Sequence, residues 1–457
     1  MALKKRRLFA GFLAAAFMTA APPAATTAFA QTTQAVSTVQ ATAVAAPPAA
    51  DTSSLKDKVD VSSMTEWRHD IHAHPETAYG EVRTAEKIDG LLRSWGLETH
   101  TNVGKTGVVG ILRGPNTGPG SPSICLRADI DALPITETTG VDYASTTAGK
   151  DHACGHDGHT AMLLGAAKYL AETKNFTGTV YFIFQPAEEG GAGAKAMIDD
   201  GLFQFVHCDG IYGMHAWPGL PAGQIGIAEG DITAASDNFS IHIIGKGGHA
   251  AYPADNIDAI SMAADIVSAL HHFKDDNVPA NEGAVLAVTM LHGGEAINAM
   301  PEKVDLAGTV RTFSPETQDK LEKGIKETAE RIAATYGAKV EVTYTRGYPS
   351  VFNSHDQVEA ARKAAGDVVG ASNVVPFKRT MAGEDFSYYS QIVPGAYIAL
   401  GQWDGKSPKT QLHSPDFNFN DATLATGASY WIDLVQTQMP LKPAPQPPVP
   451  QPSAPKP

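Results

Sequence analysis

Two patterns of apolar and polar positions follow one another along this chain. In the first half, segments with helical spacing alternate with short apolar runs of the kind that form buried strands. The predicted helices cover 65–73, 84–95, 160–171 and 192–199, and the predicted strands cover 108–112, 124–126, 179–184 and 210–214. Because strands that alternate with helices tend to pair side by side, this order predicts a mostly parallel sheet covered on both faces.

The pattern changes near Ala234. The elements predicted beyond it are strands at 238–244, 285–291, 303–313 and 339–344 and helices at 257–272 and 317–336. This order predicts two helices on one face of a four-stranded antiparallel sheet. We interpret residues 232–348 as an inserted α+β domain, and 55–231 and 349–437 as the two parts of an α/β domain. The first pattern returns after Val351, with elements at 357–369, 395–400 and 421–436.

The two ends of the chain differ from the rest. Basic residues at 4–7 precede an apolar run at 8–21, and Ala28 and Ala30 offer the small side chains that a signal peptidase reads. An uncleaved membrane anchor is the alternative, but the run is too short to span a bilayer comfortably. We therefore predict a signal peptide at 1–30 and an exported protein, periplasmic or secreted, without a membrane span after signal removal. Residues 31–54 are predicted to be a flexible spacer, and 438–457 a Pro-rich disordered tail.

The net charge of the chain is strongly negative. Without the leader, 31 basic residues face 49 acidic residues, a formal charge of −18. This balance argues against nucleic acid and anionic membrane surfaces as partners. Of the three cysteines, Cys125 lies in an apolar run and is predicted to be a core residue, and no close pairing pattern appears. Cys154 lies among histidines and is predicted to be a metal ligand.

The strongest chemical signal is His-Ala-Cys-Gly-His-Asp-Gly-His at 152–159, directly before a predicted helix. A cysteine thiolate and a neutral imidazole suit zinc and related first-row metals. Cys154 and His156 lie two residues apart, a spacing that lets a loop turn both onto one ion. A single histidine is more often a core residue, but that explanation fits this density of ligands poorly.

A second signal is Gln-Pro-Ala-Glu-Glu-Gly-Gly at 185–191, after a predicted strand. The carboxyl ends of parallel strands line the crevice where such sheets place their sites. In an extended segment adjacent carboxylates point to opposite sides, so one of Glu188 and Glu189 can bind a metal while the other faces a water molecule. A solvated acidic turn is the alternative. His215 and His413 also follow predicted strands, although a lone histidine is more often structural.

Two weaker signals remain. Asp129 and Asp131 lie at the end of another predicted strand, on the same side, and can orient a ligand imidazole or touch the ion. A polar strand end that caps the next turn is the alternative. His249 lies in a glycine-rich loop of the inserted domain.

Together these segments closely resemble the N-acyl-amino-acid amidohydrolases, which include hippurate hydrolases, within the superfamily of metallo-aminopeptidases and carboxypeptidases. The resemblance runs through nearly the whole folded region. The segments that carry it are 68–76, 126–134, 152–159, 185–190, 213–215, 245–249, 298–301, 308–311, 382–386 and 412–414. The chain has Asp129 and Asp131 where peptidase branches of the superfamily place a His-x-Asp pair. Asp131 is therefore a candidate for orienting a ligand.

The resemblance implies roles for individual residues. The implied metal ligands are Cys154, His156, Glu189, His215 and His413. Glu188 matches the general base, and His249 matches a histidine that polarises the scissile carbonyl. Asn298, Arg311 and Gly383 match substrate-binding positions, with Arg311 holding the free carboxylate. Family members often bind two ions of zinc, manganese, cobalt or nickel, and some dimerise through the inserted domain, so that this histidine enters the partner's site.

These roles imply metal-dependent hydrolysis of the amide bond of N-acyl amino acids, hippurate-like or N-acetyl, by a homodimer. In this mechanism Glu188 takes a proton from water and returns it to the leaving amine. The alternative is an exported carboxypeptidase or dipeptidase that acts on short peptides, which differs from an N-acyl-amino-acid hydrolase only in its substrate. A non-catalytic metal- or amino-acid-binding envelope protein is a further alternative, although a pure binding site has no need of Glu188.

Overall fold

A computed structural model describes residues 54–406 and 409–441. The predicted signal peptide, nearly all of the predicted spacer and most of the predicted tail lie outside these residues. Of the predicted tail only residues 438–441 are described, and Gln438 is the last residue of helix α12 (Leu424–Gln438), so the boundary at 438 stays a prediction. Among the described residues, no helix has both the length and the apolar character needed to cross a membrane.

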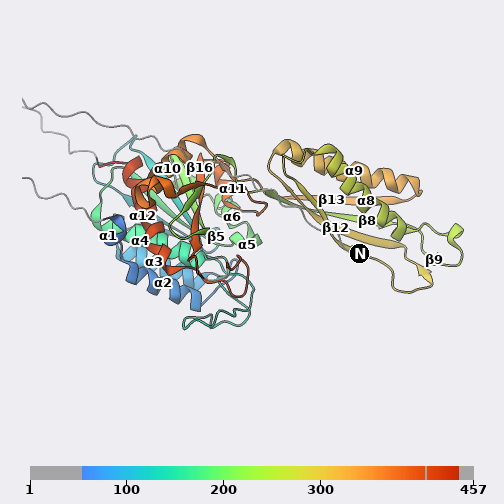
Figure 1. Ribbon diagram of the computed structural model, residues 1–457, viewed down its shortest axis with the longest axis horizontal. Coiled ribbons are helices and arrows are strands. Elements are labelled where there is room, and N and C mark those ends of the chain that lie inside the picture. Colours follow the sequence, from blue (N-terminus) through green and yellow to red (C-terminus); the bar gives the residue numbers. More distant parts are fainter. Residues whose placement is uncertain (1–53, 407–408, 442–457) are drawn as a thin grey trace, which may run out of the picture. The chain divides into compact units, whose positions relative to one another are not determined.

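The larger sheet has eight strands in the order β1-β2-β4-β3-β5-β16-β6-β15. Its strands β5 and β16 are labelled in Figure 1. Their bounds in this order are Glu98–Val103, Gly107–Arg113, Thr179–Gln185, Ser123–Asp129, Gly210–Pro221, Gly395–Trp403, Ile225–Ile227 and Val374–Pro376. The neighbours from β4 to β16 all pair in parallel, as do β6 and β15. The mostly parallel sheet is thus confirmed, but β2 runs antiparallel to β4, and the polar edge strand β1 was not predicted.

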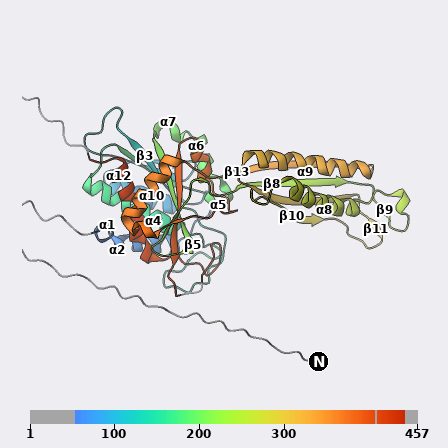
Figure 2. The same cartoon turned by 45° about the horizontal axis from the view of Figure 1, so that its top comes forward.

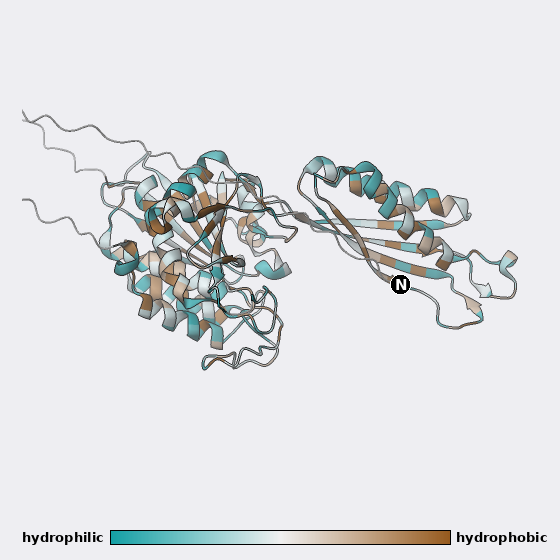
Figure 3. Ribbon diagram, viewed as in Figure 1, coloured by the Kyte–Doolittle hydropathy of each residue, from teal (hydrophilic) through white to brown (hydrophobic). Residues whose placement is uncertain are grey.

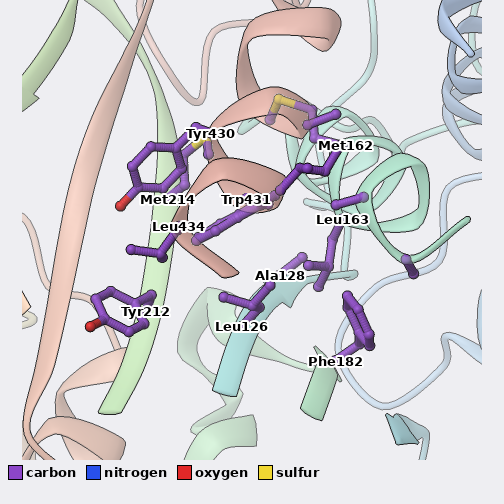
Figure 4. Packing of buried hydrophobic residues seen from close by; sticks show 14 of the residues in the cluster. Leu126, Ala128, Met162, Leu163, Phe182, Tyr212, Met214, Tyr430, Trp431 and Leu434 are labelled. Atoms are coloured by element: carbon purple, nitrogen blue, oxygen red, sulfur yellow. The ribbon is translucent and has the colours of Figure 1, made fainter. Parts of the chain in front are cut away.

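Helices cover both faces of this sheet. One face packs against α2 (Val61–Ala73), α3 (Val82–Ser94), α4 (His156–Thr173), α10 (His355–Val369) and α12. Figure 4 shows part of that packing, where Leu126 and Phe182 from the strands meet Met162 and Trp431 from the helices. The other face packs against α6 (Gly193–Asp199), α7 (Leu202–Phe205) and α11 (Phe386–Ser390). Because successive side chains of a strand point to opposite faces, strands buried on both sides are largely apolar, and Figure 3 shows brown, hydrophobic stretches in this sheet.

The second sheet has four antiparallel strands in the order β10-β12-β8-β13 (Figure 2). Their bounds are Val285–His292, Lys303–Thr312, Ala235–Ile244 and Lys339–Tyr348. Helices α8 (Ala259–Asn277) and α9 (Pro315–Thr335) share one apolar core with it. The alternation in β8 follows from this packing, because Phe239 and Ile241 are buried whereas Asn238 and His242 are exposed. The predicted α+β architecture is confirmed, and its elements run from Ala235 to Tyr348; the boundaries at 232 and 348 stay a prediction.

The remaining elements are short. They are the helices α1 (Leu55–Lys58) and α5 (Glu188–Gly191), the strand pairs β7 (Gly230–Asp231) with β14 (Phe352–Asn353) and β9 (Gly248–His249) with β11 (Ala299–Met300), and the 3-10 turns Pro253–Asp255, Ala371–Asn373 and Asp421–Thr423.

A disulfide joins Cys125 on β3 to Cys208 in the loop before β5. Cys125 is a core residue, as predicted, but the sequence analysis did not pair the two cysteines. They lie 83 residues apart in the sequence, and their Cα atoms are 5.7 Å apart only because β3 and β5 are neighbours in the sheet. The pairing therefore depends on the strand order.

Candidate metal centre

The loop before α4 brings Cys154 and His156 together. Gly155 has a φ angle of 87°, a left-handed conformation that glycine adopts without strain, and α4 begins at the next residue. The loop is joined to the segment around His413, whose backbone N–H donates to the carbonyl of Ala153 at 2.8 Å. Cys154 and His156 are both buried.

Strand ends supply further side chains to the same place. The pairing of β3 with β5 ends at Arg127 and Gly213, and His215 follows two residues later. His215 was predicted to follow the end of its strand, which is wrong, because β5 continues to Pro221 and pairs with β16 as far as Trp403. His413 lies in the loop after β16 and has a φ of 63°, which is uncommon for a residue with a side chain and marks strained functional positions.

All five predicted ligands converge in the structure. The Sγ atom of Cys154 lies 3.3 Å from Nε2 of His215, and Oε1 of Glu189 lies 3.1 Å from Nε2 of His413. Three groups have their ligand atoms within 4.8 Å of one another: Cys154 with His156 and His215; Cys154 with Glu189 and His413; and His156 with Glu188 and Glu189. We call these six residues the ligand cluster.

The two glutamates do not lie in an extended segment, so that part of the sequence analysis is wrong. They begin α5, a short kinked turn; Ala187 directly before it and Gly190 within it have positive φ angles of 50° and 82°. Both carboxylates therefore reach the ligand cluster from one side. Glu189 approaches His413 and His156, and both glutamates line the wall of an adjoining cavity.

Asp131 holds this turn in place. Its Oδ1 accepts the N–H of Glu188 and its Oδ2 accepts the N–H of Glu189, each at 3.0 Å. Its backbone carbonyl lies 2.8 Å from Nδ1 of His156, which leaves Nε2 of that ring toward the ligand cluster. The contacts support the orienting role inferred for Asp131. Asp129 instead lies 2.6 Å from Nδ1 of His159, whose Nε2 accepts the N–H of Ala216.

The cluster has the electrostatics of a cation site. Burial, together with Glu189 and Glu188, raises the pKa of the Cys154 thiol, and burial lowers the pKa of His215 to about 3, so its imidazole is neutral. One buried atom of the cluster, Nε2 of His156, has no hydrogen-bond partner, and Oε1 of Glu189 has only the 3.1 Å contact with His413. Such atoms cost free energy unless something binds them. A divalent cation fits this donor set of sulfur, imidazole and carboxylate and compensates its negative charge.

A buried charged network beneath the site was not assigned by the sequence analysis. The guanidinium of Arg127 donates to Asp129 at 2.7 Å and to both Glu384 and Asp385 at 3.0 Å. Tyr397 donates to the other oxygen of Glu384. Arg127 and Glu384 lie in the segments 126–134 and 382–386, which carry the resemblance, but nothing in their spacing indicates that they meet. Burial and the negative charge of Glu384 raise the pKa of Glu188.

A cavity of about 490 Å³ adjoins the ligand cluster. Its polar wall includes Cys154, Glu188, Glu189, His215, Glu384 and His413. Its apolar wall includes Trp217, Ile232, Phe377, Tyr397, Ile398, Ala399 and Leu412. Gly383 lines the cavity, as the resemblance implied.

Three residues that were predicted to contact the substrate or its scissile carbonyl do not line this cavity. His249 is exposed on β9, and its Nδ1 accepts the N–H of Ala251 at 3.1 Å. Arg311, at the end of β12, donates to the hydroxyl of Thr309 at 2.7 Å. The carbonyl of Asn298 accepts the N–H of Ala250. A single chain in this structure thus brings together the ligands and Glu188 but not these three residues.

Comparisons with known proteins agree with this geometry. The N-acetylcysteine deacetylase of Bacillus subtilis is 37% identical over 386 residues, which cover 83% of this chain and 98% of that protein. The hippurate hydrolase of Campylobacter jejuni is 36% identical over 368 residues, which cover 80% and 94%. The crystal structure of the Bacillus subtilis YXEP protein, described as a dinuclear metal-binding peptidase of the M20 family, is 35% identical, covers 83% of this chain and 98% of its own, and has a TM-score of 0.73. The model of peptidase family M20/M25/M40 matches residues 125–437, and the chain belongs to this family.

Proposed function

We propose that the protein is a metal-dependent amidohydrolase that cleaves the amide bond of N-acyl amino acids. The observation that carries this proposal is the position of Glu188, a buried carboxylate beside five convergent ligands and on the wall of a cavity. A binding site has no use for such a base. The names of the relatives, a deacetylase of N-acetylcysteine and a hydrolase of hippurate, support the same reaction class.

The ions are held by Cys154, His156, Glu189, His215 and His413. The dinuclear relative supports two ions for each subunit, and the mixed sulfur, nitrogen and oxygen donors suit zinc, manganese, cobalt or nickel. When bound, a divalent ion supplies Lewis acidity that polarises a carbonyl and lowers the pKa of water toward about 7. Asp131 fixes the turn with Glu188 and Glu189 relative to the imidazole of His156, because it contacts all three residues.

Residues of the chain carry out proton transfer, carbonyl polarisation and substrate binding. Glu188 accepts a proton from water and delivers it to the nitrogen of the leaving amine. His249 polarises the scissile carbonyl, Arg311 holds the free carboxylate of the amino acid, and Asn298 is a further substrate contact. Because none of these three residues lines the cavity of its own chain, we propose a homodimer in which the partner subunit supplies His249. Edge strand β10, with Met290 and Leu291 exposed, is available for that contact.

The apolar wall of the cavity supports a bulky acyl group. His215 and Trp217 lie on the same face of β5, and the ring of Trp217 meets Phe377 edge-on at 5.1 Å between centroids. An apolar cavity of about 150 Å³ already binds benzene. Among the described residues that line this cavity, none is a lysine or an arginine, so it does not suit the carboxylate end of the substrate. We therefore place the acyl group there.

Hydrolysis of matched substrates tests this proposal. We expect the metal-loaded protein to cleave N-benzoyl amino acids with a higher kcat/KM than N-acetyl derivatives of the same amino acid. Trp217→Ala should lower the benzoyl-to-acetyl ratio about 10–100-fold, because it removes much of the apolar wall. Phe352→Ala, an exposed aromatic residue outside the cavity, is the matched control. A ratio that Trp217→Ala leaves unchanged, while the preference for the amino acid changes, would place the amino-acid side chain in the cavity.

The same panel separates the alternative functions. Dipeptides and short peptides belong in it, since preferred cleavage of free peptides would make the protein a peptidase. A metal-loaded protein that binds N-acyl amino acids and releases no product would be a binding protein.

We also propose export with cleavage after Ala30. The Cys125–Cys208 disulfide supports it, because disulfides persist in oxidising compartments. Protein recovered from the cell envelope should have an intact mass that corresponds to a start at or near Gln31. An intact mass that still includes residues 1–7 would exclude cleavage.

A further inference from the structure

A hydroxyl group from the four-stranded sheet holds the turn that carries Glu188. The Oη atom of Tyr348, the last residue of β13, donates to the carbonyl of Glu188 at 2.7 Å. It also accepts the N–H of Ala192 at 3.0 Å. One side chain therefore joins both ends of α5.

This turn depends on support from outside. Ala187 and Ala192, which flank α5, have positive φ angles of 50° and 55°, and alanine adopts this conformation only at a cost in free energy. Side chains from other parts of the chain satisfy its backbone. Asp131 accepts the N–H groups of Glu188 and Glu189, and Glu81 accepts the N–H of Ala187 at 3.0 Å. Tyr348 differs from these carboxylates because it belongs to the other sheet.

The end of β13, at Tyr348, lies next to the cavity. Tyr348 pairs with Ser236 at the start of β8, and both residues line the cavity wall. A Cβ atom at Gly383 would lie 3.2 Å from the Cβ of Ser236, so the loop that carries Glu384 packs against the same point. The chain thus enters the four-stranded sheet near Ser236 and leaves it at Tyr348, and both residues line the same cavity as Glu188.

We propose that Tyr348 is a positioning residue that aligns the carboxylate of Glu188 and makes this alignment depend on where the four-stranded sheet lies. This role rests on the function of Glu188 proposed for the same site. Hydrogen bonds need a donor–acceptor distance of at most about 3.2 Å and weaken steeply when the donor angle falls below about 120°, so a small shift of β13 weakens both contacts of the hydroxyl. A misplacement of about 1 Å at a reacting group costs on the order of 10²-fold in rate. A movement of the inserted sheet therefore changes the position of the catalytic base.

Tyr348→Phe tests this role because it removes only the hydroxyl and keeps the ring, which packs against Tyr388. We expect kcat on the best N-acyl amino acid to fall roughly 10–100-fold, with KM and bound metal near wild type. Tyr344→Phe is the matched control. Tyr344 lies on the same strand, and its hydroxyl donates to Asp237 at 2.7 Å, away from the turn with Glu188. We expect this control to keep kcat within about twofold of wild type, since the hydroxyl of Tyr344 contacts no atom of the turn with Glu188.

A second readout excludes a merely structural effect. In a Glu188→Gln background the alignment of residue 188 no longer matters for proton transfer, so Tyr348→Phe should lower the residual activity no further. Three outcomes would overturn the role of Tyr348 and leave the proposed function unaffected. They are an additive loss in this double variant, an effect confined to KM, and an equal loss in Tyr344→Phe. A wild-type protein that is inactive on every N-acyl amino acid would overturn the proposed function and this role with it.

Discussion

Glu188→Gln is expected to lower turnover roughly 10²–10⁴-fold, the range that a general base contributes. Glutamine keeps the shape and the hydrogen-bonding atoms of glutamate but loses its basicity. The turn around residue 188 should survive, because Asp131 and Tyr348 hold its backbone and not its side chain. Bound metal and substrate affinity should therefore stay near wild type. Elemental analysis, equilibrium binding and steady-state kinetics on one preparation measure all three.

Cys154→Ser is the matched control for this prediction. It changes a ligand in the same cluster, and a serine hydroxyl is not ionised at neutral pH as a metal-bound thiolate is. We expect bound metal and turnover to fall together in Cys154→Ser, but only turnover to fall in Glu188→Gln. Turnover near wild type in Glu188→Gln would show that another group takes the proton. Asp131 would then be the first to test, because its carboxylate lies directly beneath the turn.

His249→Ala is expected to lower kcat roughly 10²–10³-fold, the usual loss when one donor to a developing oxyanion is removed. His249 lies on β9 and does not line the cavity of its own chain. If the partner subunit supplies it, two inactive variants should complement each other. Mixed dimers of His249→Ala with Glu188→Gln contain one site with an intact Glu188 from the first variant and an intact His249 from the second. Activity should recover to a fraction of wild type in that site alone.

The complementation experiment needs two checks. Native mass spectrometry must show that mixed dimers form, and His242→Ala, an exposed histidine on the four-stranded sheet, should be active without mixing. Mixed dimers that stay as inactive as their parents would show that His249 does not act in the partner's site. A monomer with full activity would exclude the dimeric site altogether.

The sequence was sufficient where short-range rules apply. A period of two residues in β8 and helical spacing in α9 follow from which face of each element is buried, so the α+β architecture was predictable. The apolar runs of β3, β4 and β5 predicted a buried sheet in the same way. Cys154 and His156 were recognisable as candidate ligands because they stand two residues apart directly before a predicted helix, whereas the choice of Glu189 over Glu188 came only from the resemblance.

Other features were decided only by the tertiary structure. The polar strand β1 forms because a partner strand satisfies its backbone, and its side chains carry no apolar signal. The disulfide depends on β3 and β5 being neighbours. The kinked turn of Glu188 exists because Asp131, Glu81 and Tyr348, which are distant in the sequence, satisfy its backbone. Local sequence encodes the conformations that a segment prefers by itself, whereas a strained turn is stable only when contacts from elsewhere in the chain outweigh its cost.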